Sequence, residues 1–141
     1  MTRRIYSARE PNKLTHIITL ESCPAGSRSN LTEDRDLMQI SRIGLPEGKI
    51  VKPHRHLKKS LAFTEIDQIE CWIVTRGRLK ISLFDVDFTL MESLEISVGA
   101  LVVTIAGGHS IDWCAPDTEL IEIKMGPYIG DDKIAFNITN V

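Results

Sequence analysis

The chain is poor in cysteine, and its cysteines cannot all pair with one another. Of the 141 residues only 3 are cysteine, and no two of them form a CxxC motif. An odd number leaves one thiol unpaired in any intramolecular disulfide scheme, which is typical of proteins in a reducing compartment. The cysteine usage therefore predicts a cytoplasmic protein.

Long apolar runs and an excess of positive charge are also missing. No stretch approaches the roughly 18 apolar residues of a membrane-spanning helix, so we expect no membrane partner. The sequence has 17 Lys and Arg against 19 Asp and Glu, a net charge of -2. A nucleic-acid-binding protein would need a broad basic field, so nucleic acid is not an expected partner either.

One local basic cluster stands out against this balance, formed by Lys52, Arg55, Lys58 and Lys59. Such a cluster either forms a solvated strand edge and loop or contacts a phosphate, a carboxylate or a nucleotide-sugar diphosphate. Arg supplies forked donors to such groups, and Lys supplies a point charge. On the second interpretation, Arg55 and Lys58 are substrate-binding candidates.

Helical periodicity is scarce, whereas short alternating runs bounded by Gly or Pro follow one another along the chain. Many short strands at regular spacing predict a single-domain, all-β sandwich or barrel. We expect an N-terminal strand and linker (1–36), a barrel (37–126) and a C-terminal tail that packs on the barrel (127–141). The predicted strands cover residues 13–20, 37–43, 49–56, 69–76, 78–85, 88–97, 100–105, 109–114 and 119–125.

Three histidines and one glutamate carry the strongest functional signal. His54 and His56 are two residues apart, and positions i and i+2 of a strand share a face, so both rings can reach one ion. Pro53 favours an extended chain at this point. Glu70 opens an apolar, strand-like run, and His109 opens another after a Gly-Gly turn. On adjacent strands the four side chains would bind one divalent transition metal, such as Fe, Mn, Ni, Co or Zn. The alternative is that the histidines are surface or hydrogen-bonded residues without a metal.

The spacing around these residues resembles the first motif of the cupin superfamily. That motif is a Gly, five residues, His-x-His, a short gap, and a Glu followed six residues later by a Gly. Here these positions are Gly48, His54, His56, Glu70 and Gly77. The gap, residues 57–69, is longer than in the motif, and we interpret it as an enlarged loop at the barrel mouth. The second cupin motif is only partly matched, because the histidine that would be its ligand arrives one residue early.

The second half of the chain adds a narrower resemblance, to the small WbuC-type cupin-fold metalloproteins. Ranges 79–85, 122–128 and 131–133 carry it, together with His109. The resemblance implies a cupin barrel, that is a double-stranded β-helix or jelly roll, with a bound metal. Because WbuC-type proteins are encoded among bacterial O-antigen and other polysaccharide biosynthesis genes, it also implies a role in surface polysaccharide biosynthesis. Cupins commonly dimerise, so the N-terminal segment is expected to pair with the sheet of a second copy in a homodimer.

These observations predict a metal-dependent enzyme, isomerase- or epimerase-like, that acts on a small sugar or nucleotide sugar. Glu65 and Asp67 in the enlarged loop are candidate catalytic bases. Trp72 and Trp113, each on the face of a predicted ligand, are candidates for stacking on a sugar ring or for ordinary core packing. Three alternatives stay open, namely an Fe-dependent dioxygenase, a sugar- or metabolite-binding module without turnover, and a metal-free epimerase.

Overall fold

The computed structural model describes residues 2–130 and 132–137, and every regular element within these ranges is a β-strand. The all-β class predicted from the sequence is therefore confirmed. No helix that could span a membrane occurs in the ranges that the structure describes. The strands are β1 (Thr2–Tyr6), β2 (Leu14–Thr19), β3 (Arg28–Asn30), β4 (Met38–Leu45), β5 (Val51–His56), β6 (Lys59–Leu61), β7 (Thr64–Ile66), β8 (Glu70–Arg76), β9 (Arg78–Phe84), β10 (Leu90–Ser97), β11 (Leu101–Thr104), β12 (Gly108–Cys114), β13 (Thr118–Met125) and β14 (Lys133–Ala135).

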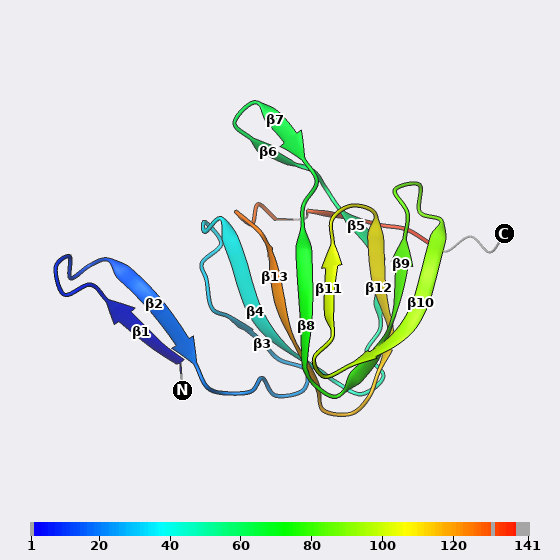
Figure 1. Cartoon of the computed structure of the whole chain (residues 1–141), viewed down its shortest axis with the longest axis horizontal. Helices are drawn as coiled ribbons and strands as arrows, with labels where there is room; N and C mark the ends of the chain where they lie inside the picture. Colours follow the sequence, from blue (N-terminus) through cyan, green and yellow to red (C-terminus); the bar gives the residue numbers. More distant parts are fainter. Residues whose placement is uncertain (1, 131, 138–141) are drawn as a thin grey trace.

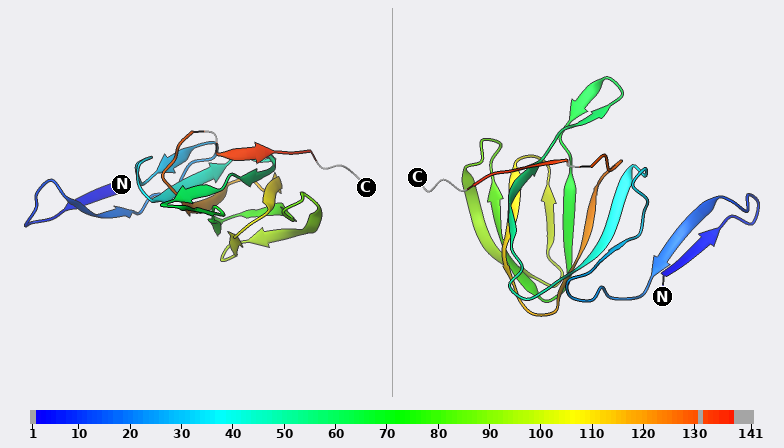
Figure 2. Two further views of the ribbon diagram at one scale, coloured as in Figure 1. Left: turned by 90° about the horizontal axis from the view of Figure 1, so that it is seen from above. Right: turned by 180° about the vertical axis from the view of Figure 1, so that it is seen from behind.

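Two five-stranded antiparallel sheets form the barrel, one against the other (Figure 1, Figure 2). Their strand orders are β10-β9-β12-β5-β14 and β11-β8-β13-β4-β3. The turns after β8, β10 and β12 meet at the lower end of Figure 1, which we call the closed end. The opposite end, where β5 finishes and β8 begins, is called the open end.

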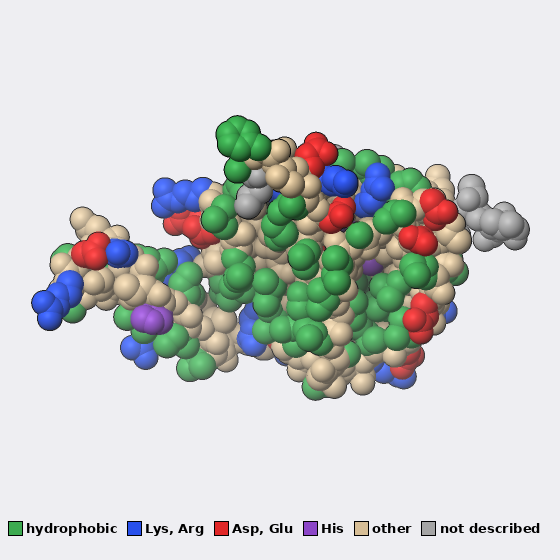
Figure 3. Space-filling model, turned by 45° about the horizontal axis from the view of Figure 1, so that its top comes forward, with side chains coloured by type: hydrophobic (Ala, Val, Ile, Leu, Met, Phe, Trp, Pro, Cys, Tyr) green, Lys and Arg blue, Asp and Glu red, His purple; other side chains and the backbone are tan. Residues whose placement is uncertain are grey.

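The hydrophobic core fills the space between the sheets toward the closed end. Side chains of alternating positions meet there because successive residues of a strand point to opposite faces. Burial of each large aliphatic side chain contributes roughly 1.5–3 kcal/mol. The core residues are Leu45, Trp72, Val74, Leu79, Ile81, Ile96, Ile111, Cys114 and Leu120. On the outside, hydrophobic side chains cover much of the face seen in Figure 3, and charged side chains gather along its upper rim.

A single residue, Gly77, joins β8 to β9 at the closed end. Its φ is +74°, and a Cβ at this position would lie 2.5 Å from Thr118 Oγ1. Glycine has no Cβ and adopts positive φ without strain, so it alone fits this turn. The tight turn fixes the register of the two strands that carry much of the core.

The barrel includes segments that lie outside the predicted range 37–126. Strand β3 pairs with β4, and β14 pairs with β5, so both sheets gain a short edge strand. The predicted loop 57–69 contains the hairpin β6–β7, which projects beyond the open end (Figure 1). Three-residue strands carry too little alternation to be recognised in a sequence.

Residues 2–20 form an arm that stands clear of the barrel (Figure 1). Strands β1 and β2 pair with each other in a two-stranded sheet. Arg4 Nη1 reaches the Leu31 carbonyl at 3.5 Å. The arm thus contains a hairpin where the sequence predicted a single strand, and its exchange between two subunits stays a prediction.

Candidate metal centre

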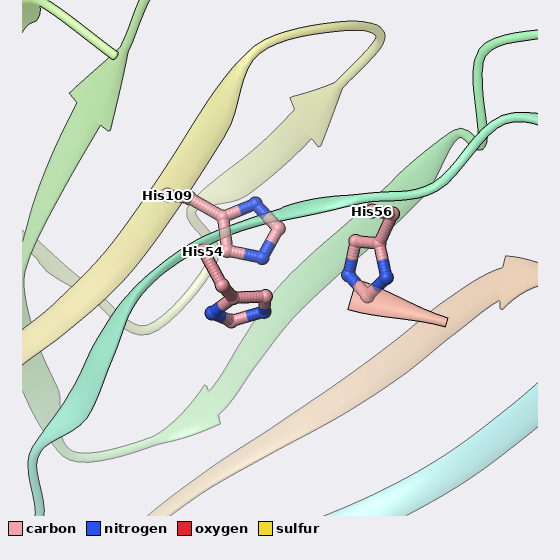
Figure 4. Close-up of side chains that lie close together, drawn as sticks. All are labelled: His54, His56 and His109. Carbon is pink, nitrogen blue, oxygen red and sulfur yellow. The ribbon is translucent and has the colours of Figure 1, made fainter. Parts of the chain in front are cut away.

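Three histidines from two neighbouring strands meet at the open end of the barrel (Figure 4). His54 and His56 come from β5 and His109 from β12, and His109 is the direct cross-strand partner of His54. One potential ligand atom of each ring lies within 4.8 Å of the others. Directly opposed residues of an antiparallel pair share a face, so the pairing explains why the three rings converge.

Irregular backbone next to the cluster aims two of the rings. The pairing of β5 with β12 shifts register between His109 and Ile111, opposite Pro53. A proline cannot donate to the ladder and is tolerated at such a bulge. The Lys52 carbonyl there lies 2.9 Å from His54 Nδ1. Just before β12, a Cβ on Gly107 would lie 2.3 Å from the backbone oxygen of Phe84 at the end of β9. Only glycine therefore fits at the position that leads into β12 and His109.

In two of the three rings, a hydrogen bond at one nitrogen leaves the other nitrogen available. His54 Nδ1 bonds to the Lys52 carbonyl, and His109 Nδ1 lies 2.9 Å from Thr104 Oγ1. His109 Nε2 and both nitrogens of His56 are buried without a hydrogen-bond partner among the described residues. Metal-binding histidines have this arrangement, because the outer nitrogen is fixed by a protein acceptor and the inner lone pair points at the ion. The donor set therefore fits a divalent transition metal.

Glu70 lies against two of the three rings. Its Oε2 atom is 2.6 Å from His56 Nε2, and its Oε1 atom is 3.7 Å from His109 Nε2. His56 Nε2 and Glu70 Oε2 are close, but their geometry is not that of a hydrogen bond. Trp72 Nε1 donates to Glu70 Oε1 at 2.5 Å, which fixes the carboxylate. Glu70 is thus beside the cluster, and its role as a fourth ligand stays a prediction.

The electrostatics of the site keep the Glu70 carboxylate charged and the His54 and His109 rings neutral. Burial opposes ionisation of Glu70, but its contact with His56, the neighbouring His109 ring and the charge of Lys124 lower its pKa to about 2. Burial lowers the pKa of His109 to about 4 and also lowers the pKa of His54. Neutral imidazole and ionised carboxylate are the forms that bind metals, so both are ready at neutral pH.

A second buried carboxylate, Asp132, supports the cluster from behind His56. Its Oδ1 atom is 3.7 Å from His56 Nδ1, and Gln68 Nε2 donates to Oδ2 at 3.2 Å. Burial opposes its ionisation, but Lys124 and the Gln68 hydrogen bond lower its pKa. Sequence reasoning assigned no role to Asp132 or to Thr104. The only available signal was an acidic pair next to a segment that turned out to be an edge strand.

The predicted catalytic and anion-binding residues lie on another side of His56. Arg55, Lys58, Glu65 and Asp67 line a cleft of about 570 Å³ together with His56. Lys58, Glu65 and Asp67 are exposed at this cleft. The structure thus brings these four residues together near one histidine, and it does not place the two carboxylates within the histidine cluster.

The two predicted tryptophans have different environments. Trp72 is buried, and its ring centroid lies 4.5 Å from that of His109. Trp113 is 36% exposed, and its ring lies under Arg78. The pairing of β12 with β9 shifts register between Ile111 and Trp113, so the strand changes faces there. The prediction that Trp113 lies on the inner face with His109 is therefore wrong. Cys114 points into the core instead.

A cavity of about 210 Å³ connects the cluster to the interior between the sheets. Its wall combines charged side chains with aliphatic side chains of the core. The residues that line it are Arg28, Ile43, Leu45, Lys49, Val51, His54, His56, Glu70, Trp72, Ile111, Leu120, Glu122, Lys124 and Lys133.

Known proteins share the fold of the chain, although no family model and no curated protein matches it. KdgF from Halomonas sp. is 17% identical, covers 70% of this chain and 76% of its own, and has a TM-score of 0.53. A protein with a double-stranded β-helix domain from Klebsiella pneumoniae is 12% identical, with 82% and 90% coverage and a TM-score of 0.58. An oxalate decarboxylase variant from Bacillus subtilis is 15% identical, with 70% and 24% coverage and a TM-score of 0.54.

These likenesses show that the chain has the cupin fold, the double-stranded β-helix predicted from its sequence motif. At such identities they show the fold alone. The narrower resemblance to WbuC-type proteins stays a prediction.

Proposed function

We propose that this cupin-fold chain is a metal-dependent enzyme that acts on a small, oxygen-rich substrate such as a sugar or nucleotide sugar. The observation that carries the proposal is the buried cluster of His54, His56 and His109, in which nitrogens of His56 and His109 form no hydrogen bond with any described residue. Burying a polar nitrogen without a hydrogen bond lowers the stability of the folded state, and a bound ion would offset that cost. A neighbour of similar fold is by its name a decarboxylase, so the fold supports catalysis elsewhere.

Each residue of the site has a role in this proposal. A divalent ion held by the three histidines and Glu70 would act as a Lewis acid on a carbonyl or hydroxyl oxygen of the substrate. Trp72 fixes the Glu70 carboxylate through its indole N–H. Asp132 lies on the far side of His56, where its Oδ1 atom is 3.7 Å from Nδ1 of the ring. Isomerisation or epimerisation in surface polysaccharide biosynthesis is the reaction class and pathway that we propose, with Glu65 or Asp67 as the base.

A second candidate function, ligand binding without turnover, is favoured by a specific observation. Glu122 pairs with Arg28 at 2.5 Å, and Asp132 is held by Gln68 and Lys124. These two carboxylates are already engaged, whereas a general base must be free to take a proton. A binding module would retain its ligand unchanged, which separates it from an isomerase or an Fe-dependent dioxygenase.

Metal content of the untagged protein tests the proposal. We expect near-stoichiometric metal by mass spectrometry in the natural protein and none in the His54→Ala/His56→Ala double variant. His16→Ala is the matched control, because His16 is exposed on β2 in the arm. Absence of metal in the natural protein after reconstitution with Fe, Mn, Ni, Co and Zn would refute the proposal.

Candidate substrates then separate an enzyme from a binding module. Metal-loaded protein is incubated with a panel of sugars and nucleotide sugars, and products are followed by NMR. Conversion that is lost in the double variant supports the enzyme, whereas tight binding without any product supports the second candidate.

A further inference from the structure

The cavity beside the histidine cluster has an unequal set of charges. Four cationic side chains line it, namely Arg28, Lys49, Lys124 and Lys133, against two carboxylates, Glu70 and Glu122. Its two histidines left aside, the lining therefore carries two more positive than negative charges. The whole chain, in contrast, has a net charge of -2. The positive excess is thus local to the cavity.

The sheet register turns two of these lysines toward the cluster. Lys133 on β14 is the direct cross-strand partner of His56, and Lys124 on β13 is the direct partner of Glu70. Opposed residues of an antiparallel pair point to the same face, so both ammonium groups share the face that carries the site. The two lysines come from different sheets and approach the cluster from two sides.

Part of the positive charge is not neutralised by the protein. Arg28 pairs with Glu122 at 2.5 Å, and Lys124 Nζ lies 3.7 Å from Asp132 Oδ2. Lys133 is exposed, and it forms no salt bridge with any residue that the structure describes. A lysine in this position has three donors and a full charge to offer to a ligand.

The cations lie on the route between the cluster and solvent. Arg28, Lys124 and Lys133 line the inner cavity and also a second pocket of about 350 Å³, whose lining includes the carboxylates Asp34 and Asp132. Arg28 and Lys133 belong to the edge strands β3 and β14 of the two sheets, and both line the same two spaces. Anything that reaches the histidines from this side passes three positive groups.

We propose that the site takes a small anionic substrate whose carboxylate or phosphate is held by Lys133, Lys124 and Arg28, while its oxygen-rich end reaches the histidines. This inference rests on the proposed metal-dependent function, and it narrows the substrate from any sugar to an acidic one. Positive groups in a confined, partly desolvated pocket attract anions more strongly than the same groups in bulk water.

Calorimetry with three related probes tests the proposal on the metal-loaded full chain. Glucuronate, glucose 6-phosphate and glucose share a pyranose ring and differ in charge. We expect at least one acid to bind about tenfold or more tightly than glucose, a difference of about 1.4 kcal/mol. Tighter binding of glucuronate identifies a carboxylate substrate, and tighter binding of glucose 6-phosphate identifies a phosphate.

Two lysine variants connect such a preference to the cavity. Lys133→Gln should weaken binding of the preferred acid several-fold and leave glucose binding unchanged. Lys80→Gln is the matched control, because Lys80 is an exposed lysine of a barrel strand outside the cavity lining. Equal binding of all three sugars, no binding of either acid at millimolar concentration, or no effect of Lys133→Gln would overturn the inference.

The same titration on metal-free protein separates this failure from failure of the proposed function. If the natural protein binds no metal after reconstitution but still prefers the acids, the metal-dependent enzyme is refuted and the anion site is retained. Stoichiometric metal with no preference for acids would do the reverse.

Discussion

Strand β8 changes character between the two ends of the barrel. At the open end, Glu70 lies beside the histidines. Two residues further along the strand, Trp72 contacts Glu70 and His109. Nearer the closed end, Val74 is only 1% exposed and belongs to the core. Strand β13 follows the same order, since Lys124 pairs with Glu70 and Leu120 with Val74. The same two strands thus supply stability at one end, through apolar burial, and chemistry at the other, where buried polar groups cost stability.

The largest expected effect comes from breaking the closed end. Leu79 is fully buried in the core, and Leu79→Ala should lower the free energy of unfolding by about 2–5 kcal/mol through lost burial and a cavity. Urea unfolding measures the change. Leu101→Ala on β11, where the leucine is 62% exposed, should cost less than about 0.5 kcal/mol. Equal costs at both positions would contradict the assignment of stability to the buried core.

Changing the open end should affect the metal and spare the fold. Glu70→Gln keeps the shape of the side chain and an oxygen acceptor for Trp72 but removes the charge. We expect metal affinity to fall about 10–100-fold, as measured by competition with a chelator, with the urea midpoint nearly unchanged. Asp67→Asn is the matched control, because Asp67 is an exposed carboxylate of the neighbouring cleft. Unchanged affinity in Glu70→Gln would exclude Glu70 as a ligand.

Mild acid should weaken the metal-free protein through the open end alone. Burial lowers the pKa of His109 from 6.5 to about 4 and lowers that of His54 as well. Their contribution to stability is complete above pH 6.5, where both states are neutral, and is lost as pH falls from 6.5 toward 4, because the unfolded chain binds protons first. We expect a loss of about 1–2 kcal/mol between pH 7 and pH 5. Urea unfolding of His109→Gln should show a smaller loss, and an equal loss would contradict this origin.

Removing the arm should change neither end of the barrel. The hairpin β1–β2 pairs within itself, and an isolated two-stranded hairpin is marginally stable. Deletion of residues 1–20 should therefore alter the free energy of unfolding by less than about 0.5 kcal/mol and leave metal binding intact. If the arm is exchanged between two copies, light scattering will show a dimer for the full chain and a monomer for the truncated one. A full-length monomer at micromolar concentration would refute the predicted homodimer.

Local patterns were sufficient to predict most of the barrel and the core of the site. Alternation marked nine of the strands within a few residues, and the i, i+2 spacing of His54 and His56 placed both rings on one face, as the cluster confirms. His109 meets His54 and His56 only because β12 pairs with β5. Periodicity does not predict that pairing, whereas the resemblance to the cupin motifs does.

The misses have physical causes that lie outside local pattern. Trp113 was expected inside because parity was counted through a bulge that no residue type announces. Asp132 reaches His56 only because β14 joins the sheet next to β5, a long-range pairing of three residues. The hairpin within 57–69 has strands too short to alternate visibly.

The short edge strands have a further consequence, for behaviour at high concentration. Each of the two sheets has, at one of its edges, a strand of only three residues, which is β3 in one sheet and β14 in the other. So short an edge offers few unpaired backbone groups on which a strand from another molecule could add. The longest edge, β10, carries exposed Glu92 and Glu95, whose charges oppose stacking of like strands. The barrel can therefore leave one side open to a ligand without becoming a template for fibrous aggregation.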